Sequence, residues 1–122
     1  MIVNLTPHAV RVVLDKGRTQ TFDPSGTVAR VTTASRTVAD LGGIPCDTTV
    51  YFGIDGLPPV KPGVAYIASA MVAQRAWSDG RYDVVHPGDL LRDDAGNVIG
   101  CRNFTVSPKC PWRDDSSEVS HV

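Results

Sequence analysis

The sequence predicts a mostly β domain of the α+β class, either a compact antiparallel sheet or a barrel-like fold, with one short helix near residues 70–77. Stretches rich in Val, Ile, Thr and aromatic residues recur at short spacing, and clusters of Gly, Pro and Asp separate them. Glu occurs only at position 118, whereas the other acidic residues are all Asp, which favours turns and caps over helix interiors. A single alanine-rich run has the composition of a helix.

The first half of the chain predicts four extended segments. We expect strands at residues 2–5, 9–14 and 19–22, with a hairpin turn at residues 15–18 in which Gly17 supplies the positive φ. A longer run at residues 27–38 follows, where alternation with period two places Arg30 on the same face as Val28. The Leu-Gly-Gly sequence at residues 41–43 ends this run.

The second half predicts further strands and the helix. We expect strands at residues 48–54 and 64–69, separated by Pro- and Gly-rich turns, and then the helix at residues 70–77, which Ser-Asp-Gly at residues 78–80 ends. Strands at residues 81–85 and 97–106 complete the expected domain, residues 1–106. Residues 107–122 are too polar to bury a core, so we expect a poorly ordered tail.

Size and charge exclude several classes of function. A chain of 122 residues, 42% apolar and 20% charged, fits one globular domain. A net charge of -1 provides no basic field for a long nucleic acid or an anionic membrane. No apolar run is long enough for a membrane span and the first residues lack the plan of a secretory leader, so we expect a cytoplasmic protein.

No catalytic or metal-binding motif is recognisable. The three cysteines and three histidines show no zinc-site spacing, and the odd cysteine count argues against a disulfide framework. Nucleophile-elbow, Walker-type and dinucleotide-binding glycine patterns are also missing. Cys101 beside His8 or His86 is a formal thiol and base, but its apolar neighbours favour a core position. We therefore expect that the chain is not an enzyme and that it binds no metal ion and no cofactor.

Arginines within β sequence are the strongest indication of binding. Nine of the twelve basic residues are Arg, whose planar fork suits phosphate and carboxylate. Arg30 lies inside a strand-like run, Arg92 precedes a turn, and Arg102 stands beside Asn103 and Phe104, which together are able to read and stack on a base. The alternative is that these arginines are solvated residues of edge strands.

The segment at residues 4–8, Asn-Leu-Thr-Pro-His, allows two interpretations. Asn4 and Thr6 flank a proline in a short turn, where their side chains bond to the backbone. The first interpretation is a purely structural turn. The second is that Asn4 and His8 line the edge of a ligand pocket.

Five blocks of the sequence resemble a family of small phage and prophage proteins, the Thoeris anti-defence sponges. The blocks are residues 4–8 (NLTPH), 25–31 (SGTVARV), 66–73 (YIASAMVA), 83–93 (DVVHPGDLLRD) and 99–101 (IGC).

The resemblance implies a binding protein rather than an enzyme. Such sponges capture cyclic ADP-ribose-type and cyclic oligonucleotide signals without cleaving them, in the cytoplasm of the infected bacterial host. The resemblance further implies a homo-oligomer with ligand pockets at subunit interfaces, and arginines line part of these pockets. Arg30, in the second block, and Arg102, directly after the last, are the residues that match as phosphate partners.

Two other functions compete with this interpretation. A phage structural or protein-binding module would expose its arginines and have no concave pocket. A nucleotide-acting enzyme would use Cys101 or His8 and would return its ligand chemically altered.

Overall fold

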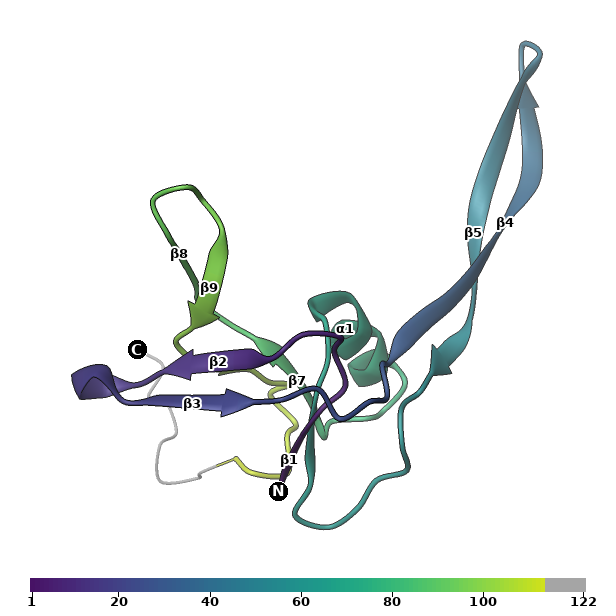
Figure 1. The fold of residues 1–122 in the computed structure, drawn as a ribbon. Coiled ribbons are helices and arrows are strands. Elements are labelled where there is room, and N and C mark those ends of the chain that lie inside the picture. Colours follow the sequence, from purple (N-terminus) through teal and green to yellow (C-terminus); the bar gives the residue numbers. More distant parts are fainter. Residues whose placement is uncertain (114–122) are drawn as a thin grey trace, which may run out of the picture.

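The computed structural model describes residues 1–113 and is mostly β with one helix, as predicted (Figure 1). In chain order the elements are β1 (Ile2–Asn4), β2 (Val10–Val13), the 3-10 turn η1 (Asp15–Gly17), β3 (Thr19–Phe22), β4 (Arg30–Leu41), β5 (Ile44–Asp55), β6 (Ala65–Ile67), α1 (Ala70–Ser78), β7 (Val84–Pro87), β8 (Leu90–Arg92), β9 (Val98–Cys101) and β10 (Phe104–Thr105).

The strands form three small sheets rather than the single antiparallel sheet or barrel that we expected. Two are four-stranded, in the orders β1-β6-β7-β10 and β3-β2-β9-β8, and the third is the β4–β5 hairpin. Strands β1, β6 and β7 run parallel, and β2 also runs parallel to β9. The sequence alone does not reveal this because strand direction depends on the connection, and a helical crossover returns β7 parallel to β6.

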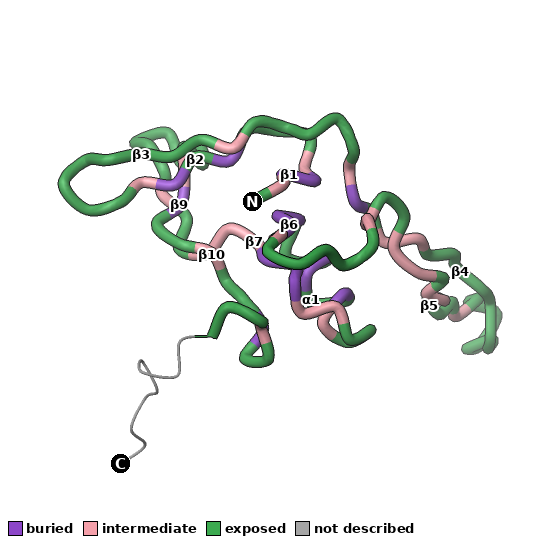
Figure 2. Tube along the Cα trace, turned by 90° about the horizontal axis from the view of Figure 1, so that it is seen from below, coloured by how far each residue is buried: buried purple, intermediate pink, exposed green. Residues whose placement is uncertain are grey.

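Helix α1 forms where the sequence predicts it and covers the first sheet. The Ser69 hydroxyl caps its N-terminus by accepting from the amide of Val72 at 3.2 Å. Val72, Ala73 and Ala76 are buried, and their spacing places them on one side of the helix. They pack with Tyr66 and its neighbours in the larger core cluster, which Figure 2 shows as the buried region around α1, β6 and β7.

A second, smaller core cluster joins the two four-stranded sheets. Val10, Val12, Ile67, Val85 and Cys101 are buried together between the two four-stranded sheets, and two phenylalanines pack at the edge of this cluster. The chain is thus held by two adjoining clusters of modest size.

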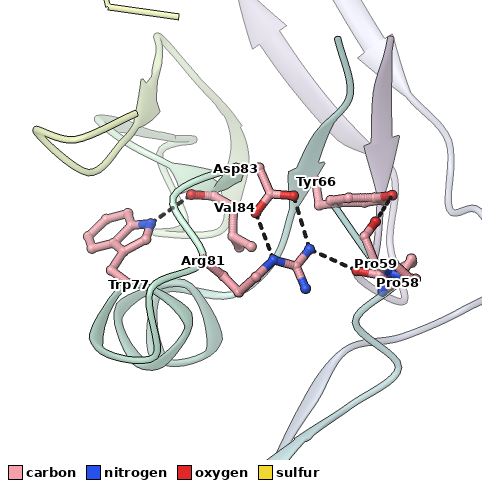
Figure 3. A network of polar contacts seen from close by, with 7 residues as sticks. All are labelled: Pro58, Pro59, Tyr66, Trp77, Arg81, Asp83 and Val84. Carbon is pink, nitrogen blue, oxygen red and sulfur yellow. Dashed lines mark hydrogen bonds and ion pairs between the residues drawn. The ribbon is translucent and has the colours of Figure 1, made fainter. Parts of the chain in front are cut away.

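A network of polar contacts attaches the loop after β5 to the body (Figure 3). Arg81 donates to both carboxylate oxygens of Asp83 at 3.0 Å and to the Pro58 carbonyl at 2.7 Å. The Tyr66 hydroxyl donates to the neighbouring Pro59 carbonyl at 3.2 Å. Because Asp83 is only 4% exposed, these contacts pair a buried charge.

The β4–β5 hairpin projects from the body (Figure 1) and is mostly exposed (Figure 2). Its strands meet at the tip, where we expected a break, because Gly42 and Gly43 form the turn of one hairpin and Leu41 pairs with Ile44. Gly42 and Gly43 have φ of 60° and 90°, which suits a turn between antiparallel strands.

The end of the described chain is a turn beyond the expected domain boundary at residue 106. Ser107 is buried, and its carbonyl accepts from the amide of Cys110 at 2.9 Å. The remainder of the expected tail, residues 114–122, lies outside the described residues.

Candidate functional site

Two arginines from separate parts of the sequence line one hollow of about 330 Å³. Arg18 follows η1 at the end of the β2–β3 hairpin, and Arg102 follows β9 in the same sheet. We call this the arginine hollow, which is lined by Val13, Leu14, Asp15, Arg18 and Arg102.

The backbone at both arginines is fixed. Arg102 donates its amide to the Asp89 carbonyl at 2.9 Å, and the Arg18 carbonyl accepts from the Leu14 amide at 2.6 Å. The β2–β9 pairing, with Val12 opposite Cys101, brings the two segments together. The hollow is therefore built on sheet hydrogen bonds rather than on a free loop.

Both guanidinium groups are available to an anion. Within residues 1–113 the Arg81–Asp83 contact is the only ion pair, and neither Arg18 nor Arg102 has a side-chain hydrogen bond to protein. Two planar forks in one hollow suit a phosphate or diphosphate. Asp15 also lines the hollow, and its negative charge partly offsets the two positive charges there.

The structure does not bring Arg30 and Arg102 together within one chain. Arg30 opens β4 opposite Asp55, whereas Arg102 follows β9, and these elements lie on opposite sides of the body in Figures 1 and 2. Alternation along β4 also directs Arg30 to the other face from Val31. The proposed role of Arg30 stays a prediction, and it does not involve the arginine hollow of the same chain.

Three other predicted ligand residues have structural partners. Arg92 donates to the Gly96 carbonyl at 2.9 Å across the β8–β9 turn. The Asn103 amide accepts from the Asp89 backbone at 2.9 Å and donates to the Asp89 carboxylate at 3.1 Å. Phe104 packs against Phe22 with ring centroids 5.9 Å apart. A ligand would have to compete with these contacts.

Asn4 is engaged on every polar atom of its side chain, in agreement with the structural interpretation of its turn. Its amide nitrogen donates to the carbonyls of His8 and Phe22 at 2.8 and 2.9 Å. Its oxygen accepts from the amide and hydroxyl of Thr6 at 2.9 and 2.7 Å. His8 contributes its backbone carbonyl to this turn and exposes its ring.

Replacing Asn4 by alanine should therefore lower stability and leave ligand binding to the folded protein unchanged. The asparagine is 2% exposed, and its loss leaves several partly buried backbone groups unpaired, at roughly 2 to 3 kcal/mol. His8→Ala is the matched control, because only the His8 backbone is used, and it should change stability little. Urea unfolding of both variants tests this, and equal destabilisation by the two would contradict it.

A second hollow, of about 680 Å³, lies between the base of the β4–β5 hairpin and α1. The Arg75 guanidinium stacks 3.8 Å from the Tyr51 ring centre, and the Tyr51 hydroxyl donates to the Asp79 carboxylate at 2.6 Å. That carboxylate raises the pKa of the Tyr51 hydroxyl, through the hydrogen bond first. These contacts join the hairpin to the helix. They also engage Arg75, which is the only arginine that lines this second hollow.

Arg18, Tyr51 and Arg75 were not predicted as site residues. Arg18 sits in an ordinary turn sequence, and only the parallel pairing of β2 with β9 gives it Arg102 as a neighbour. Tyr51 and Arg75 meet through the placement of α1 against the hairpin. No local sequence pattern distinguishes any of the three.

The thiol of Cys101 is a core group, as its neighbours suggested. It is 1% exposed, and its sulfur lies 3.6 Å from the Arg11 carbonyl. Burial raises the pKa of this thiol and so disfavours the nucleophilic thiolate. His86, one of the two formal bases, lies beside Trp77 in a tilted arrangement with ring centroids 5.8 Å apart.

Only two of the three thiols should react readily with a disulfide reagent in the folded protein. Cys46 and Cys110 are half-buried, whereas Cys101 should react only after unfolding. Because the folded pKa of Cys101 is raised, its contribution to stability is intact below the ordinary thiol pKa and is lost as the pH rises through the raised value. Thiol titration with and without denaturant counts the reactive thiols. Three rapid equivalents without denaturant would contradict the expected count of two.

The described residues show neither a metal cluster nor a membrane-spanning helix. Residues 1–113 hold no group of three His, Cys, Asp or Glu side chains placed to bind a metal ion. The single helix of this part is too short to cross a membrane.

Comparisons with protein-family models, with curated proteins and with solved structures found no match for this chain.

Proposed function

We propose that this protein captures a small cyclic nucleotide, of the cyclic ADP-ribose or cyclic oligonucleotide type, and holds it without chemical change. The observation that carries the proposal is the convergence of Arg18 and Arg102, both without protein partners among residues 1–113, on one hollow. The place of action would be the cytoplasm of an infected bacterium, where such a signal is made.

The hollow matches the phosphate part of such a ligand in charge. A cyclic nucleotide carries phosphates joined to sugar and base, so it needs paired positive forks beside less polar surface. Arg18 and Arg102 provide the forks, and Val13 and Leu14 provide apolar walls. Phosphate is bound well by such forks because each makes two parallel hydrogen bonds.

The hollow also has a suitable size for part of the ligand. Its volume of about 330 Å³ lies at the lower end of ordinary ligand pockets, which hold roughly 300 to 1,000 Å³. Phosphate and ribose fill a space of that size, which leaves the bases to contact a further surface. A second copy of the chain would provide that surface, in line with the homo-oligomer that the resemblance implies.

Capture without cleavage needs no nucleophile, and the surroundings of Cys101 favour this proposal over an enzyme. A buried thiol with a raised pKa is a poor nucleophile, and the His86 ring packs beside Trp77. Sequestration depends on affinity alone, so two unpaired arginines on a fixed backbone would be sufficient.

Incubating the protein with a bacterial nucleotide extract tests the proposal. After washing, heat should release a phosphate-bearing nucleotide whose mass matches that of the same compound in the untreated extract. An altered mass would favour a nucleotide-acting enzyme. Release of no nucleotide would favour the second candidate, a phage structural or protein-binding module, which the exposure of Arg30, Arg92 and Arg102 and of the β4–β5 hairpin supports.

A further inference from the structure

A third arginine shares one face of the second four-stranded sheet with the arginine hollow. In β2 the side chains of Val10 and Val12 are buried, so alternation turns Arg11 and Val13 to the opposite, outer face. Val13 lines the arginine hollow, and Arg11 is the preceding residue on that face, about 7 Å away along the strand. The exposed Arg11 side chain therefore adjoins the hollow without lining it.

Strand β3, which lies beside β2 in Figure 1, adds hydroxyl groups to the same face. Opposite residues of an antiparallel pair point to the same side, with their Cβ atoms about 5 Å apart. Arg11 is opposite Thr21, and Val13 is opposite Thr19. Both threonines are exposed, so Arg11 has a free-standing hydroxyl group beside it.

Strand β9, on the other side of β2, leaves the floor of this face open at Gly100. The parallel pairing of β2 with β9 places Gly100 beside Arg11. A Cβ atom on Gly100 would lie 3.6 Å from Cγ2 of Val13, which assigns residue 100 to the same outer face. A hollow of about 180 Å³, to which Arg11 and Gly100 both contribute, follows the arginine hollow along β2 and β9.

The arginines of this face have little compensating charge. Within residues 1–113 the Arg11 guanidinium makes neither an ion pair nor a hydrogen bond to protein, as is true of Arg18 and Arg102. Among the described residues that line the two hollows, Asp15 alone carries a carboxylate. Like charges that lie close together destabilise the folded chain, so this arrangement favours a bound anion.

We propose that Arg11 and Thr21 form a second phosphate subsite beside the arginine hollow, and that the site takes nucleotides with at least two phosphate groups. The inference rests on the proposed function and narrows it, because a nucleotide with one phosphate leaves one of the two subsites empty. A guanidinium fork with a neighbouring hydroxyl is a suitable donor set for phosphate. Val13 and Gly100 lie between the subsites and offer a less polar floor for the sugar.

Inorganic phosphate and inorganic triphosphate are the probes that test this subsite, because they differ in the number of phosphate groups and carry no base. NMR titration of the full, isotope-labelled chain follows the backbone amides and gives the dissociation constants. Phosphate should shift amides of the arginine hollow alone. Triphosphate should also shift the amides of Arg11 and Thr21.

Arg11→Ala should weaken triphosphate binding by about tenfold or more and change phosphate binding by less than about twofold. Arg11→Lys should recover only part of the affinity for triphosphate, because a point charge lacks the planar fork. Arg36→Ala is the matched control, since it removes an exposed arginine from β4, and it should bind both anions like the wild type. Circular dichroism checks that each variant is folded.

Equal triphosphate affinity of the wild type and folded Arg11→Ala, or an equal loss in Arg36→Ala, would overturn the second subsite. The release of nucleotide from extract tests the proposed function separately, because the inorganic probes contain no nucleotide. A chain that captures nucleotide but binds triphosphate without Arg11 loses only the second subsite. A chain that binds triphosphate through Arg11 but releases no nucleotide retains the subsite and loses the proposed function.

Discussion

Replacing Arg102 or Arg18 by alanine is expected to weaken binding of the captured nucleotide by about thirtyfold to a thousandfold, or roughly 2 to 4 kcal/mol. Each change removes a charge-assisted fork and leaves a phosphate oxygen unpaired. Arg→Lys should also bind poorly, because a point charge does not reproduce two parallel hydrogen bonds. Stability should change little, since within residues 1–113 neither guanidinium has a hydrogen bond or ion pair to protein.

Calorimetric titration with the nucleotide recovered from extract measures these effects. Lys61→Ala is the matched control, since it removes one exposed positive charge that lies outside the arginine hollow. Arg30→Ala belongs in the same series, because the sequence resemblance gave that residue an equal role. Unchanged affinity in both the Arg18 and Arg102 variants would show that the arginine hollow does not bind the nucleotide.

Replacing Asp83 by alanine should lower the free energy of unfolding by about 3 to 5 kcal/mol, which corresponds to a fall in Tm of roughly 10 to 20 °C. Asp83 is buried and pairs with Arg81, which would be left as an uncompensated charge beside the core. The same change would loosen the loop that Arg81 holds through the Pro58 carbonyl.

Thermal melts of three variants and the wild type separate this explanation from a general effect of losing an aspartate. Asp94→Ala, in an exposed turn, should stay within about 0.5 kcal/mol of the wild type. Replacing Arg81 and Asp83 together by Met and Leu should destabilise less than Asp83→Ala, since no buried charge then lacks a partner. A double variant as unstable as the single one would contradict this account of the pair.

Local sequence patterns predicted the elements better than their arrangement. The strand at Thr19–Phe22 and the helix from Ala70 were found because alternation, alanine content and a serine cap are local features. Strand β8, only three residues in a turn-rich region, was missed. Parallel pairing of β1, β6 and β7 was also missed, because neither the crossover through α1 from β6 to β7 nor the pairing of β1 with the distant β6 is a local feature.

The candidate site was predicted only in part for the same reason. Arg102 was identified as an arginine beside a strand, but its neighbour Arg18 lies far away in the sequence and joins it through one parallel pairing. Asn103 and Phe104 were attractive as base-reading groups, yet their side chains contact Asp89 and Phe22. Sequence reveals which side chains are able to bind a nucleotide, whereas the fold determines which of them lack a partner.

Quantitative recovery of the nucleotide tests capture without cleavage most directly. A known amount of the nucleotide identified from extract is incubated with excess protein, and the unbound fraction is removed by ultrafiltration. Heat then releases the retained material, whose amount and mass are compared with those of the input by mass spectrometry. The account predicts that nearly all of the nucleotide is retained by the wild type, that it is released with its mass unchanged, and that Arg102→Ala retains little. Retention by neither protein, or release of a product with a different mass, would contradict it.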